Sequence, residues 1–316
     1  MDLFDRFLPD KVNIDSLRCA MSRGQYITER RIVEIKEIAD SVADFLIRSA
    51  SGPDDVCHLL SIAFEGCLLP PVTVNSDTMP QSADAVRSYS ESVDANDRAE
   101  LALLIISALS ERGIVVDEKA FLKEDYRDET VAYVKNPFAD EAYDVFSTEL
   151  SDPRVIYAKT FKEALGMLDA GEVGFCLLPL EERGARLSTV GELIFRGDFK
   201  INSVTPVFGF DGLADMKYAL VSKSFTVPPI DKDDDRYLEI RVAARDGDIS
   251  DILLAAKRYN VALYRINSSI YDIEGNNELY YSIVFRDDGG DFTGLLVYLT
   301  LFFGDYTPVG IYKNLE

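Results

Sequence analysis

Residues 160–195, TFKEALGMLDAGEVGFCLLPLEERGARLSTVGELIF, contain the signals of one complete α/β unit. Thr160 and the glutamate three residues later have the spacing of a capping box, which predicts a helix that begins here. Residues 173–178 form a short, continuous apolar run, typical of a buried strand. A second helix is predicted from about Ser188. Together these elements indicate an α/β domain built on an open sheet.

The expected functional site follows from that sheet. Pro179 is expected to end the strand, and Glu181 and Glu182 come shortly after it. Ligands of open α/β sheets bind beyond the carboxyl ends of the strands. Residues 179–183 are therefore the first place to look for function, and the two glutamates are the first catalytic candidates. An ordinary strand-end carboxylate is the alternative interpretation of Glu181.

The same stretch resembles the prephenate dehydratase family. Pro179-Leu180-Glu181 is similar to the start of that family's Pro-Ile-Glu-Asn-Ser motif, with Glu182 at the Asn position and no counterpart of the Ser. The sequence continues with three further matches to the helix that follows in the family, Gly184, Thr189 and Leu193.

Two other motifs of that family are present in altered form. Three residues remain of its Tyr-Leu-Gly-Pro-x-Gly-Thr-Phe turn, namely Tyr133, Phe138 and Ala142, without the glycines that let a backbone approach a ligand. Met216-Lys217-Tyr218 stands where the family has Thr-Arg-Phe, whose threonine acts in catalysis. Because a thioether neither donates a proton nor orients a leaving hydroxyl, Met216 does not replace that threonine.

The length of one connection also departs from the family. In prephenate dehydratases, a whole second lobe lies between the strand similar to residues 200–208 and the strand that carries Thr-Arg-Phe. Only about seven residues separate the two here, which is enough for a loop. The resemblance therefore implies a single periplasmic-binding-protein-like lobe over residues 129–225, which lacks half the walls of the family's cleft.

Residues 1–125 are predicted to be helical, with apolar stripes at helical spacing. We expect a small bundle that packs on the α/β lobe following it. The alternative is a chorismate mutase domain, which bifunctional dehydratases carry at this end. That activity needs cations aimed into the bundle, and the candidates are Arg18, Arg23, Arg30, Arg31 and Lys36.

Residues 236–316 show the order βαββαβ and follow a Pro-containing acidic linker at residues 226–235. This ferredoxin-like order resembles the ACT domain, the module that follows the dehydratase and binds phenylalanine between paired domains. The resemblance implies a homodimer and an amino-acid site. Its residues would be Gly247, Asp248 and Ile249 of one copy and Asn267, Ser268 and Ser269 of the other.

Composition excludes several classes of function. The 316 residues carry a net charge of −22, which repels nucleic acid and anionic membrane surfaces. No signal-peptide pattern or bilayer-length apolar run occurs, so we expect a cytoplasmic protein. The four cysteines match no zinc motif and His58 is the only histidine, so neither a metal nor another cofactor is expected.

Three functional hypotheses remain from the sequence. The first is a divergent, non-catalytic member of the phenylalanine-pathway family that senses an amino acid or binds a partner. The second is a working prephenate dehydratase or chorismate mutase, for which the available polar groups are Glu181, Glu182, Thr205 and Lys217. The third is a structural role in which the ACT-like region only dimerises the chain.

Overall fold

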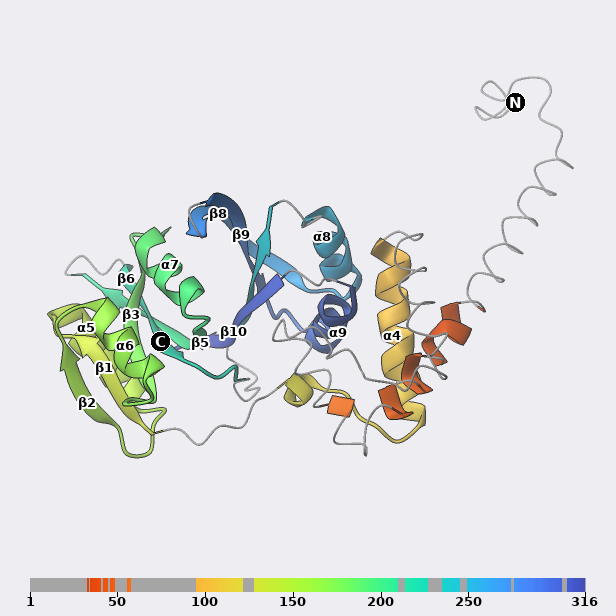
Figure 1. Cartoon of the computed structure of the whole chain (residues 1–316), viewed down its shortest axis with the longest axis horizontal. Helices are drawn as coiled ribbons and strands as arrows, with labels where there is room; N and C mark the ends of the chain where they lie inside the picture. The colour runs from red at the N-terminus through yellow and green to blue at the C-terminus, as the bar shows by residue number, and fades with distance from the viewer. Residues whose placement is uncertain are drawn as a thin grey trace, which may run out of the picture.

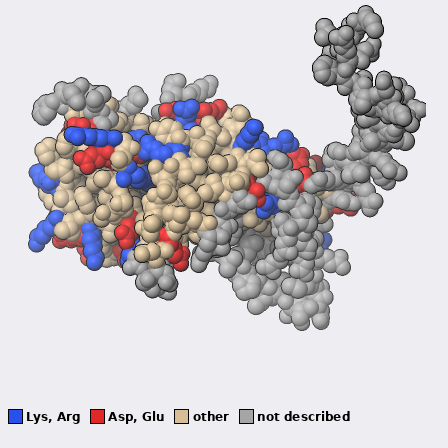
Figure 2. All heavy atoms as spheres, turned by 90° about the horizontal axis from the view of Figure 1, so that it is seen from above, with Lys and Arg blue, Asp and Glu red and all other residues tan. Residues whose placement is uncertain are grey.

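The computed structural model describes residues 33, 35–40, 42–44, 46–48, 56–57, 95–121, 128–209, 214–226, 235–244, 249–273, 276–302 and 306–315. These residues form one mixed sheet of ten strands in the order β2-β1-β3-β6-β5-β10-β7-β9-β8, with β4 paired to β3 (Figure 1). The α/β fold with a helical N-terminal region is as predicted. On the face shown in Figure 2, the acidic side chains do not gather into one patch but lie among basic side chains.

The first half of the sheet is the α/β lobe. Parallel strands β2, β1 and β3 continue into the antiparallel strands β6 and β5. The strands are β1 (Thr130–Val134), β2 (Arg154–Ala158), β3 (Phe175–Glu182), β4 (Ala185–Arg186), β5 (Lys200–Phe208) and β6 (Ala214–Ser222). Helix α5 (Pro137–Ser147) covers one face, while α6 (Phe161–Asp169) and α7 (Ser188–Arg196) cover the other.

The cap of α6 has the predicted residues. The backbone N–H of Glu163 donates to Thr160 Oγ1 at 3.1 Å. The Glu163 carboxylate accepts from the N–H of Lys159 at 2.7 Å, one residue earlier than in a standard capping box.

The expected end of β3 at Pro179 is wrong. The strand continues to Glu182, paired along this stretch with β6. The pairing register shifts between Pro179 and Glu181, and a bulge is one of the few places where a sheet accepts a proline. Glu181 is therefore held within the sheet and does not lie on a loop.

The second half of the sheet is the βαββαβ unit, whose strand order β10-β7-β9-β8 is that of a split βαβ fold. Its strands are β7 (Arg236–Ala243), β8 (Ala262–Ile273), β9 (Asn276–Arg286) and β10 (Tyr306–Asn314). Helices α8 (Ile249–Arg258) and α9 (Phe292–Phe302) cover one face. The other face carries no helix of this unit.

Among the described strands, one parallel pairing makes the two halves a single sheet. Lys313 and Asn314 of β10 pair with Ser203 and Val204 of β5. This pairing places the lobe beside the βαββαβ unit in one continuous sheet. As a result, α7 and β4 of the lobe lie against the face of that unit opposite α8 and α9.

The described part of the N-terminal region packs on the βαββαβ unit and not, as expected, on the α/β lobe. Helix α4 (Ala95–Glu111) lies on α8 and α9, on the side of the βαββαβ unit away from the lobe (Figure 1). Apolar residues of α4 and of residues 35–56 share one core with those helices. Of the mutase candidates, Lys36 is exposed and the four arginines lie outside the described residues. None of the described helices is long and apolar enough to cross a membrane.

Candidate functional site

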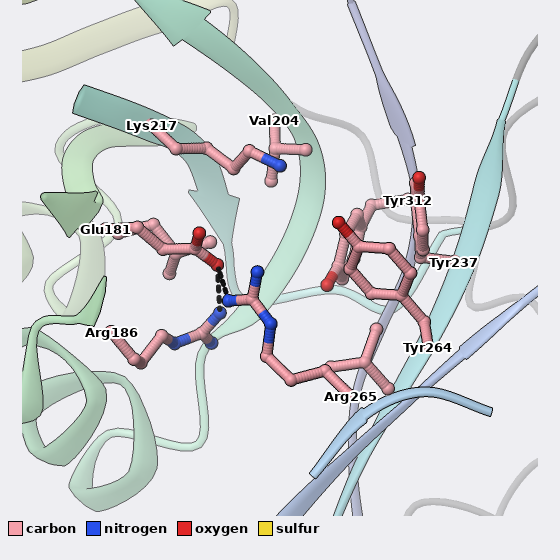
Figure 3. A pocket seen from close by; sticks show the side chains of 10 residues that line it. Glu181, Arg186, Val204, Lys217, Tyr237, Tyr264, Arg265 and Tyr312 are labelled. Carbon is pink, nitrogen blue, oxygen red and sulfur yellow. Dashed lines mark hydrogen bonds and ion pairs between the residues drawn. The ribbon is translucent and has the colours of Figure 1, made fainter. Parts of the chain in front are cut away.

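A small hollow opens where the lobe meets the βαββαβ unit (Figure 3). The lobe contributes polar residues from β3, β4 and β6, and the other unit contributes arginine and tyrosine side chains. Its lining includes Glu181, Arg186, Lys217, Tyr237, Tyr264, Arg265 and Tyr312. The cavity volume is about 10 Å³, which is the space of about one water molecule. The side chains themselves therefore fill most of the junction.

Glu181 is the central carboxylate of this hollow. Arg265 Nη1 on β8 donates to Glu181 Oε1 at 2.6 Å, and Arg186 Nη1 on β4 lies 4.0 Å from the same oxygen. Only 9% of the Glu181 side chain is exposed. Figure 3 shows that the two arginines reach the carboxylate from opposite sides of the junction. Glu181 is thus committed to an ion-pair bridge between the two halves of the protein.

The structure brings together only two of the four catalytic candidates. Lys217 lies opposite Glu181 in the β3–β6 register and lines the hollow with it. Among the described residues, its ammonium makes no ion pair. Glu182 is exposed and does not line the hollow. Thr205 is buried and its hydroxyl donates to the Leu315 carbonyl at 2.9 Å, a contact that fastens β5 beside β10.

Behind the hollow lies a buried network that sequence reasoning missed. Glu239 on β7 is fully buried and accepts from Arg186 Nη2 at 2.7 Å, from Ser282 Oγ at 2.8 Å and from Tyr312 OH at 3.1 Å. Burial by itself would raise the pKa of Glu239, but the charges of Arg186 and Arg241 and these hydrogen bonds hold it below its ordinary value. The carboxylate is therefore ionised at neutral pH and balances the arginines around it.

The mouth of the hollow is lined by tyrosines. The Tyr237 ring lies 5.0 Å from that of Tyr264 and 5.9 Å from that of Tyr312, centroid to centroid. Burial and the nearby Asp235 raise the pKa of Tyr237 to about 12. Tyr237 therefore stays protonated at neutral pH and does not serve as a base.

The turn after β1 has a structural role in this chain. Asn136 caps α5, with Oδ1 accepting from Ala139 N–H at 3.0 Å and from Tyr218 OH at 3.3 Å. Asn136 is thus used within the fold, in the turn from which this chain lacks the glycines of the dehydratase motif.

The predicted amino-acid site lies partly outside the described residues, since Gly247 and Asp248 are not among them. Ile249 begins α8 and packs on the core beneath that helix. Asn267 and Ser269 share a face of β8 with Arg265 and Tyr271, which contact the lobe. Ser268 is exposed on the other face.

The chemistry available at the hollow is cationic and donor-rich. Two guanidinium groups and one ammonium meet a single carboxylate there. Such groups hold anions, whereas arginine does not release a proton. The hollow contains no aliphatic hydroxyl, and the described residues contain no cluster of three or more His, Cys, Asp or Glu suited to a metal ion.

Comparisons with known proteins gave structural likenesses only. No protein-family model matches the sequence, and no curated protein matches it. The structure is similar to prephenate dehydratase from Streptococcus mutans, with 13% identity and a TM-score of 0.44 over 59% of this chain and 98% of that one.

Two further solved structures are similar over nearly the same share of the chain. One is prephenate dehydratase from Arthrobacter aurescens in complex with L-Phe, with 14% identity and a TM-score of 0.44 over 58% of this chain and 89% of that one. The other is GqqA, described as a novel type of quorum quenching acylase, with 17% identity and a TM-score of 0.43 over 59% of this chain and 95% of that one.

Proposed function

We propose that this protein is a non-catalytic relative of the prephenate dehydratases that binds a small amino acid or a partner through its ACT-like unit. One observation carries the non-catalytic part. Glu181, at the end of β3, is bridged by Arg265 and Arg186, and the hollow beside it holds about one water. A dicarboxylate substrate does not fit this site without breaking the ion pairs that join the two halves of the sheet.

Two further features support the proposal that this chain does not dehydrate prephenate. Met216 lies on β6 and is the residue that the sequence resemblance aligns with the family's catalytic threonine, and Thr205 is already hydrogen-bonded to Leu315. Strands β5 and β6 follow each other as an antiparallel pair and β10 borders β5 on its other side, so the described residues between and beside these strands form no second α/β lobe. Losing a positioned proton donor costs about 10²- to 10⁴-fold in rate.

The test is turnover by the purified full chain. Prephenate and chorismate are supplied separately, with an active dehydratase and an active mutase as positive controls. We expect neither phenylpyruvate nor prephenate to form above the uncatalysed rate. Turnover at about 1–10³ per second, the usual range of enzymes, would establish the catalytic alternative instead.

Met216→Thr serves as a second test of the same proposal. We expect no gain in phenylpyruvate formation, because one hydroxyl does not open a hollow closed by Glu181 and its arginines. Met216→Ser is the matched variant, which supplies a hydroxyl without the β-methyl group. A large gain in either variant would show that a catalytic cleft forms in solution.

The proposed partner is a second copy of the chain. Strand β8 is the last strand in the sheet order, and Leu263, Ile266 and Ile270 on it are exposed. A long apolar edge strand of this kind pairs readily with another strand, and a two-fold arrangement is the commonest closed solution. We expect sedimentation to show a dimer that Ile266→Lys dissociates and Leu254→Lys, on α8, leaves intact.

The proposed effector is a small amino acid at residues 247–249 of one copy, facing the exposed Ser268 of the other, since Asn267 and Ser269 lie on the face of β8 that meets the lobe. Titration calorimetry with phenylalanine, tyrosine and tryptophan tests this. We expect weak or undetectable phenylalanine binding that Asp248→Ala abolishes, because the turn contains no other carboxylate for the ammonium group. Tight binding that is unaffected by Asp248→Ala would remove this contact from the proposal.

A further inference from the structure

Arg241 on β7 has a buried guanidinium group that makes no hydrogen bond with any other described residue. The residue is 3% exposed, and its Nε makes no hydrogen bond. Within the described part of the chain, no carboxylate forms an ion pair with it. Its close neighbours are the rings of Phe195 and Tyr271, whose centroids lie 5.4 and 5.9 Å from Arg241 Cζ. Burying a charged group without a hydrogen-bonded counter-charge is costly, so this arrangement needs an explanation.

Asn267 provides a second unpartnered donor on the same face. Its Nδ2 is buried and makes no hydrogen bond. Arg241, Ser282 and Asn267 lie directly opposite one another across β7, β9 and β8. Side chains in such a row share one face of the sheet, and here the Arg241–Phe195 contact shows that this face meets α7. Both donors are thus enclosed between the sheet and α7.

The charges around these donors do not balance. Three guanidinium groups, those of Arg186, Arg241 and Arg265, share the buried carboxylates of Glu181 and Glu239. These five groups alone carry one more positive than negative charge, and the further carboxylate that acts on Arg241, that of Asp198, is paired with Lys200. Burial lowers the pKa of Arg241. The negative charge of Glu239 acts in the opposite direction, but the pKa of Arg241 remains below its ordinary value. A bound anion would stabilise the charged guanidinium.

We propose that Arg241 and Asn267 bind the carboxylate group of a small monocarboxylic acid between α7 and strands β7 and β8. A planar guanidinium matches the two oxygens of a carboxylate, and the Asn267 amide adds a further N–H. The slight exposure of Arg241 admits only a small acid or the carboxylate end of a larger one. This inference does not depend on whether the Glu181 hollow supports turnover.

Acetate is the probe, compared with chloride at equal ionic strength. The readouts on the full chain are thermal unfolding and the arginine Nε–H signals in ¹⁵N nuclear magnetic resonance. We expect acetate to raise the unfolding temperature saturably and to shift the Arg241 signal, since a ligand of the native state stabilises it. Equal effects of chloride and acetate, or an Arg241 signal that acetate leaves in place, would overturn the proposal.

Variants locate the effect. Arg241→Lys keeps the charge but loses the forked geometry, and we expect acetate to bind about tenfold more weakly. Asn267→Ala should weaken binding about two- to tenfold. Arg286→Lys is the matched control, because that arginine is partly exposed and paired with Asp288, and its acetate affinity should not change.

Each result decides the question even if one variant misfolds. If Arg241→Lys does not fold, the Arg241 signal of the unsubstituted protein and the Asn267→Ala titration remain. Acetate affinity that is the same in Asn267→Ala as in the unsubstituted protein contradicts the site as stated. Prephenate turnover would overturn the proposed function and would leave the acetate result unaffected.

Discussion

The βαββαβ unit is covered on its two faces by contacts of opposite character. On the helical side, α4 packs against α8 and α9 mainly through apolar residues, and the few described charged pairs range from the exposed Arg258–Glu100 to the buried Arg236–Glu118. On the open side, α7 and β4 enclose arginines, glutamates and tyrosines. Apolar packing is non-directional, whereas a buried polar network is stable only when every member has its partner. We therefore expect the polar contacts on the lobe side to fix the orientation of the lobe relative to the βαββαβ unit. We expect the apolar contacts on the α4 side to supply much of the free energy of folding.

Glu239→Gln should have the largest effect on stability. Arg186 would lose its buried ion-pair partner and Arg241 a nearby opposite charge, and breaking a buried pair in this way costs about 3–5 kcal/mol. Urea unfolding of the full chain measures it. Glu192→Gln, whose side chain is 37% exposed beside Arg196, is the control and should cost less than about 1 kcal/mol. Equal effects of the two substitutions would mean that the network does not hold the lobe in place.

Leu101→Ala tests the apolar side of the comparison. Leu101 is fully buried in the core shared by α4, α8 and α9, and truncating such a leucine costs about 2–5 kcal/mol. The loss of unfolding free energy in Leu101→Ala should not depend on salt or pH, whereas the loss in Glu239→Gln should. Leu254→Ala on α8 is the matched control, because Leu254 is 44% exposed. A negligible loss for Leu101→Ala would mean that α4 is not a stable part of this core.

The pH dependence of the Glu239 contribution has a definite sign. The folded pKa of Glu239 lies below its ordinary value of 4.5, so its stabilising effect is present above about pH 5. This stabilisation is lost as the pH falls through the folded-state pKa. Its size is about 1.4 kcal/mol for each pH unit that separates the folded-state pKa from the ordinary value. The difference in unfolding free energy between the unsubstituted protein and Glu239→Gln should therefore shrink from pH 6 to pH 3. A difference that grows over this range would contradict the assigned direction.

Arg258→Gln should have the smallest effect. Arg258 pairs with Glu100 at the edge of the α4 contact, where both side chains are more than a third exposed. Exposed pairs contribute about 0–1 kcal/mol and weaken with salt. Urea unfolding at low and high salt measures this, with Arg196→Gln on α7 as a comparable exposed pair. A loss above about 2 kcal/mol would show that the edge of the α4 contact is more than peripheral.

The sequence predicted the regular elements well because their local signals are complete. The Thr160 cap, the continuous apolar run of β3 and the alternating or helical spacing after residue 236 each specify one element without help from distant residues. The end of β3 was predicted wrongly because a bulge accepts Pro179 inside a strand. No local pattern indicates such a bulge.

The candidate site was only partly predictable, for a different reason. Glu239 and Arg241 alternate with Leu238, Ile240 and Val242, a pattern typical of a strand with one face in solvent. That face is covered by α7, which is about 45 residues earlier in the sequence. Opposite charges on one strand face are the available signal of a buried network. The partner of the N-terminal helices was likewise set by a long-range contact and was missed.

The position of β10 has a consequence for how this chain is made. Among the described strands β10 is the last in sequence, yet it lies in the middle of the sheet between β5 and β7. During synthesis, β1–β6 and β7–β9 leave the ribosome with the edges that β10 will join still unpaired. Strand edges of this kind expose nascent chains to misassembly, and such late, long-range pairing is slow. The joined sheet, and with it the buried arginines at the junction, is therefore complete only after residues 306–314 have emerged.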